Sequence, residues 1–278
     1  MRLDEAIASI AGRFQAAGIA SFQADAELLL SHFLKVSRGE LQAMAITGAE
    51  VDPALFEGAV IRRQSREPLQ HILGFAPFRS LELKVGPGVF VPRFETEMVA
   101  QLGIDYLRAI PGSPVAVDAG TGSGAIAIAL ALETDATVHA IELSEAAFEY
   151  AAENIANCGA AVNLIQGDFL EELMKFSGLD LLVSNPPYIP AAAVPIDPEV
   201  YNYDPELALY SGPDGLDAIR ELVSLGQIVL RPGGMMILEH ADGQSDAVRE
   251  LLLEAGWRGV SVHPDAVGRL RAVSAIRK

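Results

Sequence analysis

Apolar positions recur with helical spacing through roughly the first 66 residues. The large apolar residues of the first segment lie three or four positions apart, at Leu3, Ile7, Ile10 and Phe14. This spacing predicts a helix with one apolar face, and Gly18 follows as a stop signal. A second helix is predicted after Ser21, and further helices are predicted behind two capping residues, Ser37 and Asp52. The pattern therefore indicates a small helical bundle.

Between residues 69 and 92 the period changes to a strand-like alternation. Glycine and proline recur there at short intervals, around two short apolar runs at residues 81–85 and 89–91. This pattern predicts a β-hairpin that links two domains. We therefore expect an N-terminal helical domain over residues 1–68, a hairpin linker over residues 69–92 and a second domain over residues 93–278.

From about Pro114 onward, short apolar strands alternate with helical stretches. The strand-like runs read VAVDA, TVHAIE, VNLIQGD, LDLLVSN and MMILEH, and helices are predicted over residues 125–132 and 145–157. Such alternation predicts βαβ units in an α/β fold, with a doubly wound, mainly parallel sheet and helices on both faces. Ligands are expected at the carboxyl ends of these strands.

Charge is distributed unevenly along the chain. Residues 1–90 carry nine Lys and Arg against ten Asp and Glu, whereas residues 91–278 carry eleven against twenty-seven. An acidic surface repels phosphates, so we expect no direct nucleic-acid partner, and it attracts a basic protein. The plain alternative is that the negative charge only keeps the protein soluble.

Several features bear on where the protein works. No apolar run is long enough to span a membrane, and the N-terminal segment carries Asp4 and Glu5 where an export signal is basic and then apolar. The single cysteine, Cys158, cannot form an internal disulfide, which favours a reducing compartment. We therefore expect a cytoplasmic protein with no membrane association. The histidines lack metal-ligand spacing, so no metal is expected.

A glycine-rich loop separates the first strand of the sheet from its helix. It comprises Gly120, Thr121, Gly122, Ser123 and Gly124. Without Cβ atoms such a loop lets a ligand approach the backbone near amide groups at a helix start, which favours a nucleotide cofactor. A turn used only for tight packing is the alternative. Because Glu142 ends the next strand where a ribose-binding acid is expected, a loose dinucleotide fingerprint also fits, and NAD stays open.

Local charge favours S-adenosyl-L-methionine over NAD. Residues 109–174 contain no Lys or Arg but ten acids, which suits a cationic sulfonium better than a pyrophosphate. In this interpretation the loop holds the methionine moiety, and the Glu142 carboxylate accepts hydrogen bonds from both ribose hydroxyls. Asp168 would accept a hydrogen bond from the adenine amino group, and Phe169 would contact the adenine ring. A turn acid and a core phenylalanine are the plain alternatives, and helix-start amides can still hold a pyrophosphate.

The segment Asn185, Pro186, Pro187 and Tyr188 follows the apolar strand at residues 179–183. Two prolines fix φ and donate no amide, so the segment is rich in acceptors and poor in donors. Such a cradle suits a planar NH₂ group, with the Asn185 side chain and the Pro186 carbonyl each accepting one N–H and Tyr188 covering the flat face. Catalysis would then act mainly by positioning the nitrogen.

Several of these motifs together resemble the release-factor glutamine methyltransferases, the PrmC/HemK family. The matching segments are residues 67–70, 72–74, 91–97, 120–124, 184–189 and 230–234. The residues that depart from the usual pattern are Ser123, Glu142, Phe94 and Glu95.

The resemblance implies a seven-stranded, Rossmann-like S-adenosylmethionine methyltransferase fold and N5-methylation of the glutamine in the Gly-Gly-Gln motif of peptide chain release factors. It implies catalytic roles for Asn185, Pro186 and Tyr188 and a substrate-binding N-terminal domain. Separately, we expect a monomer. Arg62, Arg63 and Arg66 are candidate substrate contacts, although a solvated helix face also explains them. Glu239, at the end of a strand, faces the site or is an ordinary strand-end acid.

Three other functions are considered. An adenine-N6 nucleic-acid methyltransferase would use the same Asn-Pro-Pro-Tyr cradle, but the acidic charge argues against it. An NAD-dependent oxidoreductase would use the glycine loop. A regulatory module that binds the cofactor without chemistry is disfavoured by the intact cradle.

Overall fold

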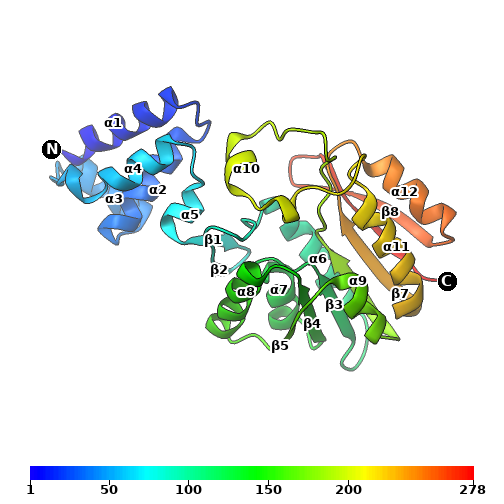
Figure 1. Ribbon diagram of the computed structural model, residues 1–278. Helices are drawn as coiled ribbons and strands as arrows, with labels where there is room; N and C mark the ends of the chain where they lie inside the picture. The colour runs from blue at the N-terminus through cyan, green and yellow to red at the C-terminus, as the bar shows by residue number, and fades with distance from the viewer. The chain divides into compact units, whose positions relative to one another are not determined.

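The computed structural model describes residues 1–278 and divides into two compact units. The first unit consists of residues 1–75 together with residues 196–203, and the second consists of residues 76–195 and 204–278 (Figure 1). None of the helices combines the length and the apolar character that a membrane span requires.

The first unit is the helical bundle that the apolar spacing predicts. Its helices are α1 (Leu3–Ala16), α2 (Phe22–Leu34), α3 (Arg38–Ile46), η1 (Pro53–Leu55), α4 (Glu57–Gln64), α5 (Leu69–Leu73) and α10 (Pro198–Tyr203). Ser37 caps α3, since its hydroxyl accepts the Glu40 amide while the Glu40 carboxylate accepts the Ser37 amide. Asp52 caps η1 rather than α4, which begins at Glu57. The buried core of the bundle is centred on Phe14, Leu29 and Leu30.

Helix α10 completes this bundle although it lies more than a hundred residues further along the chain. Arg63 of α4 is 3% exposed and pairs with Asp25 and with Glu199 of α10, at 2.8 Å in both cases. Arg66 pairs with Asp197 and Glu199, while Arg62 pairs with Glu67. A solvated helix face is therefore the wrong interpretation for Arg63, which is an interior cation of this unit.

The expected hairpin between the bundle and the sheet forms, but only one of the two predicted runs, 81–85, is a strand, and the other strand lies before it. Strands β1 (Phe75–Phe78) and β2 (Leu81–Lys84) pair with each other, and residues 69–73 are helical. Val89 and Val91 form no strand, so the predicted partner run is wrong. Both valines are buried in a small cluster with Ala147 and Tyr150, which shows that side-chain packing alone accounts for their apolar character.

The second unit contains the predicted mainly parallel sheet. Its strands are β3 (Val115–Ala119), β4 (Thr137–Glu142), β5 (Val162–Gln166), β6 (Leu179–Ser184), β7 (Leu230–Glu239), β8 (Arg258–Pro264) and β9 (Leu270–Ile276). The strand order is β5-β4-β3-β6-β7-β9-β8, and only the pairs β7–β9 and β8–β9 are antiparallel. The α/β, doubly wound, seven-stranded fold class is thus confirmed.

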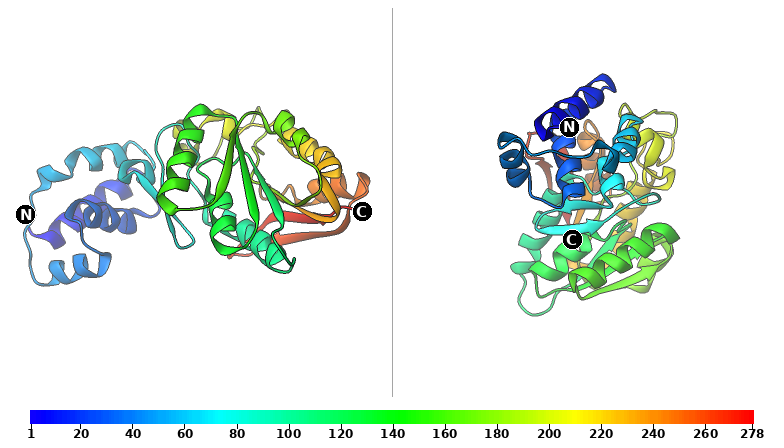
Figure 2. Two further views of the ribbon diagram at one scale, coloured as in Figure 1. Left: turned by 90° about the horizontal axis from the view of Figure 1, so that it is seen from below. Right: turned by 90° about the vertical axis from the view of Figure 1, so that its left-hand side faces the viewer.

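Helices cover both faces of the sheet (Figure 1 and Figure 2). The helices of this unit are α6 (Phe94–Arg108), α7 (Ala125–Glu133), α8 (Glu145–Cys158), α9 (Phe169–Glu172), η2 (Leu173–Lys175), η3 (Glu206–Ala208), α11 (Asp217–Val229) and α12 (Ser245–Glu254). Alternate residues of the central strands enter two cores, since Ile237 packs with α6 and α7 whereas Met236 and Leu238 pack with α11 and α12. This double burial explains the nearly continuous apolar runs in the strands.

Candidate active site

The residues singled out from the sequence gather at the carboxyl edge of the sheet. Strands β4 and β5 extend the sheet on one side of β3, whereas β6 and β7 extend it on the other. The strand order therefore reverses between β3 and β6. In open α/β sheets, ligands bind at the carboxyl edge of such a reversal. The Ser184 hydroxyl donates to the Ala119 carbonyl at 2.5 Å and so joins the ends of these two strands.

The glycine loop after β3 is shaped by three residues with positive φ. Gly120, Gly122 and Gly124 have φ of 74°, 59° and 86°. A Cβ on Gly120 or Gly122 would meet nothing within 4 Å, so open space borders the loop there. Ser123 is buried, and its carbonyl accepts the side-chain amide of Asn154 at 2.9 Å. The loop is thus fixed on its protein side and accessible on the other.

Most loop amides are used inside the protein. Gly120 and Thr121 donate to the Ile141 carbonyl, Gly124 donates to the Thr121 carbonyl, and Gly122 donates to the Glu142 carboxylate at 2.7 Å. A pyrophosphate at a helix start needs several free amides. A loop with four of its five amides already donated is therefore better suited to a ligand without phosphate.

Asp118, at the end of β3, holds this loop from below. Its Oδ2 accepts the Thr121 hydroxyl at 2.6 Å and the Ala127 amide at 3.2 Å, and its Oδ1 has no partner. Burial raises the pKa of this carboxyl to about 7. Asp118 was not among the site residues predicted from the sequence. The available signal was an acid that ends an apolar strand three residues before a threonine.

We expect Asp118→Asn to change how stability depends on pH. The raised pKa means that the folded protein keeps a proton which the unfolded chain releases, so the stabilising contribution is complete below about pH 4 and is lost as the pH rises through about 7. Asparagine keeps an acceptor for Thr121 and cannot ionise. The melting temperature of the variant minus that of the wild type should therefore increase as the pH rises from about 5 to about 8.

Thermal unfolding followed by fluorescence of the single tryptophan, Trp257, measures this difference, because Trp257 is buried in the same unit. The exposed Asp135 provides the matched control, and Asp135→Asn should show no such change with pH. A constant difference between Asp118→Asn and wild type would contradict the prediction.

Glu142 ends β4 beside the loop. Its two carboxylate oxygens accept the amides of Gly122 at 2.7 Å and Ser144 at 2.8 Å, and burial raises its pKa. Each oxygen keeps a further lone pair, so ribose hydroxyls would be additional donors rather than replacements. The structure thus places Glu142 next to the glycine loop, where it also holds the loop in place, and its contact with a ribose stays a prediction.

Asp168 and Phe169 follow β5, at the far side of β4 from the loop. Asp168 caps α9, because its Oδ1 accepts the Leu170 amide at 2.9 Å. Phe169 is partly buried and packs against the core that contains α11. Both residues therefore have structural roles, and their contacts with an adenine ring stay predictions.

The Asn-Pro-Pro-Tyr segment begins immediately after the buried strand β6. Asn185 is partly buried, and its Nδ2 donates to the Thr96 hydroxyl of α6 at 3.3 Å. Pro186 is buried, Pro187 is partly buried, and the Tyr188 carbonyl accepts the Gln244 side chain at 3.0 Å. Neither proline has an amide N–H to donate, and the role of this segment as a cradle for a substrate amide stays a prediction.

A buried carboxyl, Glu239, affects the electrostatics of the Tyr188 hydroxyl. Burial, reinforced by the neighbouring Glu239, raises the pKa of the Tyr188 hydroxyl above its usual value. Glu239 ends β7 and is 2% exposed, and burial raises its pKa to about 7. Its contact with Thr96 was not predicted, because nothing in the local sequence relates residues so far apart.

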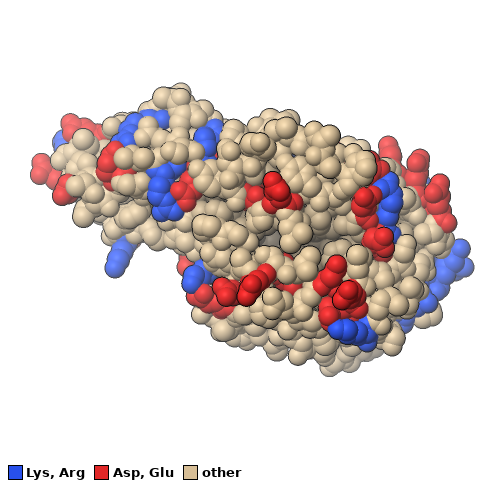
Figure 3. Space-filling model, in the orientation of Figure 1, with Lys and Arg blue, Asp and Glu red and all other residues tan.

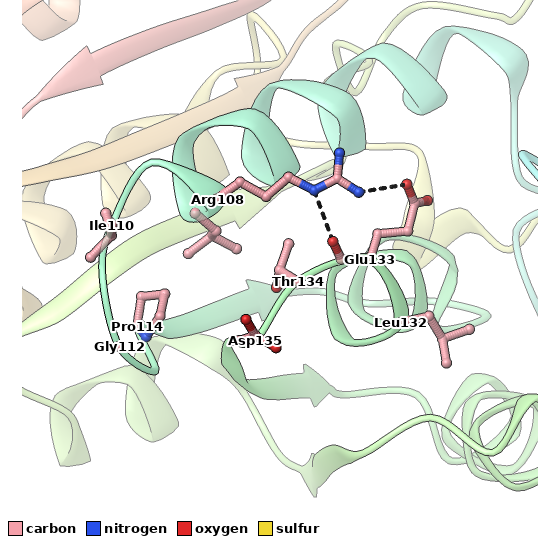
Figure 4. Close-up of a pocket in the computed structure, with 9 residues that line it drawn as sticks. Arg108, Ile110, Gly112, Pro114, Leu132, Glu133, Thr134 and Asp135 are labelled. Atoms are coloured by element: carbon pink, nitrogen blue, oxygen red, sulfur yellow. Dashed lines mark hydrogen bonds and ion pairs between the residues drawn. The ribbon is translucent and has the colours of Figure 1, made fainter.

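A separate hollow of about 310 Å³ lies at the opposite, amino-terminal edge of the sheet, between the end of α6 and the start of β3 and β4 (Figure 4). Its one cation, Arg108, donates to the Glu133 carbonyl at 3.0 Å and lies 3.8 Å from the Glu133 carboxylate. No residue of the candidate site lines this hollow, and we assign it no ligand.

Comparison with known proteins defines the class to which this site belongs. Residues 113–258, more than half of the chain, match a family model described as a methyltransferase domain, and residues 5–74 match one described as the PrmC N-terminal domain. A methyltransferase from Pyrococcus furiosus has the same fold, with a TM-score of 0.55 and 21% identity over 72% of this chain and 90% of that one. The protein is therefore a methyltransferase.

Curated relatives define the family more narrowly. The release factor glutamine methyltransferase of Streptomyces coelicolor is 47% identical over 97% of this chain and 96% of its own length. That of Mycolicibacterium smegmatis is 43% identical over 99% of this chain and 98% of its own length. The chain belongs to the release factor glutamine methyltransferase family, as its motifs indicated.

Proposed function

We propose that this enzyme transfers a methyl group from S-adenosyl-L-methionine to the side-chain N5 of the glutamine in the Gly-Gly-Gln motif of peptide chain release factors. Family membership supports the reaction class and the substrate. The observation that carries the proposal is the adjacency of the glycine loop to the Asn-Pro-Pro-Tyr segment, whose preceding Ser184 is joined to Ala119 at 2.5 Å.

The glycine loop and Glu142 suit S-adenosylmethionine. Open space beside Gly120 and Gly122 lets a ligand approach the backbone. Residues 109–174 contain acids but no Lys or Arg, which suits a cationic ligand. We assign the loop residues 120–124 to the methionine moiety, Glu142 to the ribose, and Asp168 with Phe169 to the adenine. When bound, the cofactor supplies an electrophilic methyl group on a sulfonium. The donated loop amides are the reason to disfavour NAD.

The Asn-Pro-Pro-Tyr segment is assigned to the substrate amide. A carboxamide nitrogen is a poor nucleophile because its lone pair is delocalised into the carbonyl. The Asn185 Oδ1 and the Pro186 carbonyl would accept its two N–H groups and hold the nitrogen in one orientation, which is catalysis by positioning. Tyr188 and Pro187 would bound the flat face of the amide. The raised pKa keeps the Tyr188 hydroxyl protonated, so it brings no negative charge to the site.

Charge supports a basic protein as substrate and no nucleic acid. Acidic side chains are prominent on the face of the molecule in Figure 3, and the chain carries 37 acids against 20 Lys and Arg. Fifteen of these 20 cations pair with carboxylates of the chain itself, which leaves few to neutralise phosphates. We propose a monomeric enzyme that acts in the cytoplasm, where a lone cysteine such as Cys158 stays reduced.

The N-terminal helical domain, residues 1–68, is proposed as the part that binds the release factor, with residues 69–92 as linker and residues 93–278 as the methyltransferase domain. Its match to a family-specific model supports this assignment. Because Arg63 is buried in ion pairs, it is removed from the candidate contacts. Arg62, which is about half exposed, remains a candidate.

Peptide mapping of a release factor after incubation with the enzyme and methyl-labelled S-adenosylmethionine tests the proposal. We expect one added methyl group on the Gly-Gly-Gln glutamine. A release factor with alanine in place of that glutamine is the matched control and should remain unlabelled. Label on adenine in DNA or RNA but not on the release factor would overturn the proposal in favour of the nucleic-acid alternative, and calorimetric binding of NAD alone would remove both.

A further inference from the structure

Glu239 lies beside Asn185 but has no role in the function proposed above. In the pairing of β6 with β7, Ser184 is opposite Leu238, so the residues that follow them, Asn185 and Glu239, emerge side by side at the edge of the sheet. Glu239 is 2% exposed and its Oε2 has no hydrogen-bond partner. A carboxyl is costly to bury, so its retention at this position calls for a physical reason.

Thr96 connects these two side chains. It lies in the first turn of α6 and is 4% exposed. Its hydroxyl accepts a hydrogen bond from Asn185 Nδ2 at 3.3 Å and also hydrogen-bonds the side chain of Glu239. The three side chains come from α6, from the loop after β6 and from the end of β7, and they form a short buried chain of hydrogen bonds.

The direction of this chain follows from the number of protons available. When Glu239 is ionised, its carboxylate only accepts, so the single hydroxyl proton of Thr96 points to it. Because burial raises the pKa of Glu239 to about 7, this direction is set above about pH 7. The oxygen of Thr96 is then an acceptor toward Asn185, which must present its Nδ2 to it. The Asn185 Oδ1 is left for another donor. If the Asn185 amide were flipped, its Nδ2–H would face the N–H of an approaching substrate amide. Nothing else in the geometry distinguishes the two orientations.

We propose that Thr96 and Glu239 are positioning residues, which fix the orientation of the Asn185 amide so that its oxygen faces the substrate. The inference rests on the proposed role of Asn185 as an acceptor of the substrate N–H. It adds two residues that touch neither substrate nor cofactor and that act through Asn185.

Thr96→Val tests this because valine has the shape of threonine but cannot accept from Nδ2, whereas Thr96→Ser keeps the hydroxyl. We expect Thr96→Val to lower kcat for release-factor methylation by about tenfold or more, since loss of a buried hydrogen bond of this kind is worth about 1.4 kcal/mol. KM, the Kd for S-adenosylmethionine and the melting temperature should stay near wild type. Thr96→Ser should restore most of kcat.

A second pair of variants covers the case in which Thr96→Val does not fold. Glu239→Gln keeps an acceptor for the Thr96 proton and should retain most of kcat, whereas Glu239→Leu removes it and should resemble Thr96→Val. Wild-type-like kcat in Thr96→Val or Glu239→Leu, or equal loss in both members of either pair, would overturn the positioning role. Absence of methylation by the wild-type enzyme would instead refute the proposed function itself, so the two failures are distinguishable.

Discussion

Asn185→Ala is expected to lower the turnover number for glutamine methylation by about a hundredfold to a thousandfold, the usual loss when one preorganised hydrogen-bonding group is removed from a reacting centre. Alanine removes the Oδ1 acceptor and leaves only the Pro186 carbonyl to orient the substrate amide. Stability should change little, because Asn185 is only partly buried and its side chain makes a single hydrogen bond, at 3.3 Å to Thr96.

Steady-state kinetics with saturating S-adenosylmethionine, together with a melting curve, separates these effects. Asn163→Ala is the matched control, since Asn163 is exposed on β5, away from the loop after β6, and bonds only the Val138 carbonyl. It should leave turnover unchanged. If Asn185→Ala kept its turnover, the assignment of the cradle would be wrong.

Arg63→Met should destabilise the first unit by about 3–5 kcal/mol, the cost of leaving buried charges without their partner. The Arg63 guanidinium reaches Asp25, Glu199 and the Glu67 carbonyl, all within 2.9 Å. Methionine fills much of the same volume but leaves Asp25, which is 6% exposed, without this cation. The second unit should be unaffected, because none of these partners belongs to it.

Urea unfolding followed by two signals measures this loss. Trp257 fluorescence follows the second unit, whereas far-ultraviolet circular dichroism follows the helices of both. We expect an early transition in circular dichroism that fluorescence does not share. Arg62→Met is the control, since the Arg62 side chain is about half exposed and its pair with Glu67 should be worth less than about 1 kcal/mol. Equal losses in the two variants would show that burial does not strengthen the Arg63 contacts.

Much of the second unit could be predicted because its signals are local. Alternation of short apolar runs with helical segments was enough to predict the parallel sheet, and the chain order of a doubly wound sheet places strand ends at one edge. The glycine loop, Glu142 and the Asn-Pro-Pro-Tyr segment could therefore be placed together from the sequence alone. Val89 and Val91 were misassigned because buried apolar residues in an extended loop have the same pattern as a strand.

The remaining features depend on contacts between distant residues. Thr96 meets Asn185 across 89 positions, and Arg63 meets Glu199 across 136. A threonine in a first helical turn or an arginine in an amphipathic helix has the same local pattern whether or not such a partner exists. Only the folded backbone brings these side chains within bonding distance, which is why the buried hydrogen-bond chain and the interior cation were absent from the sequence-based prediction.

The return of residues 196–203 to the first unit decides how this protein can be dissected. The polypeptide passes between its two units three times, after Phe75, after Pro195 and after Tyr203. A recombinant fragment that stops at residue 75 would lack α10 and with it Glu199, so Arg63 would lose one of its two buried carboxylate partners. An autonomous version of the first unit therefore has to carry α10 as well, joined by an artificial connection or supplied as a separate peptide.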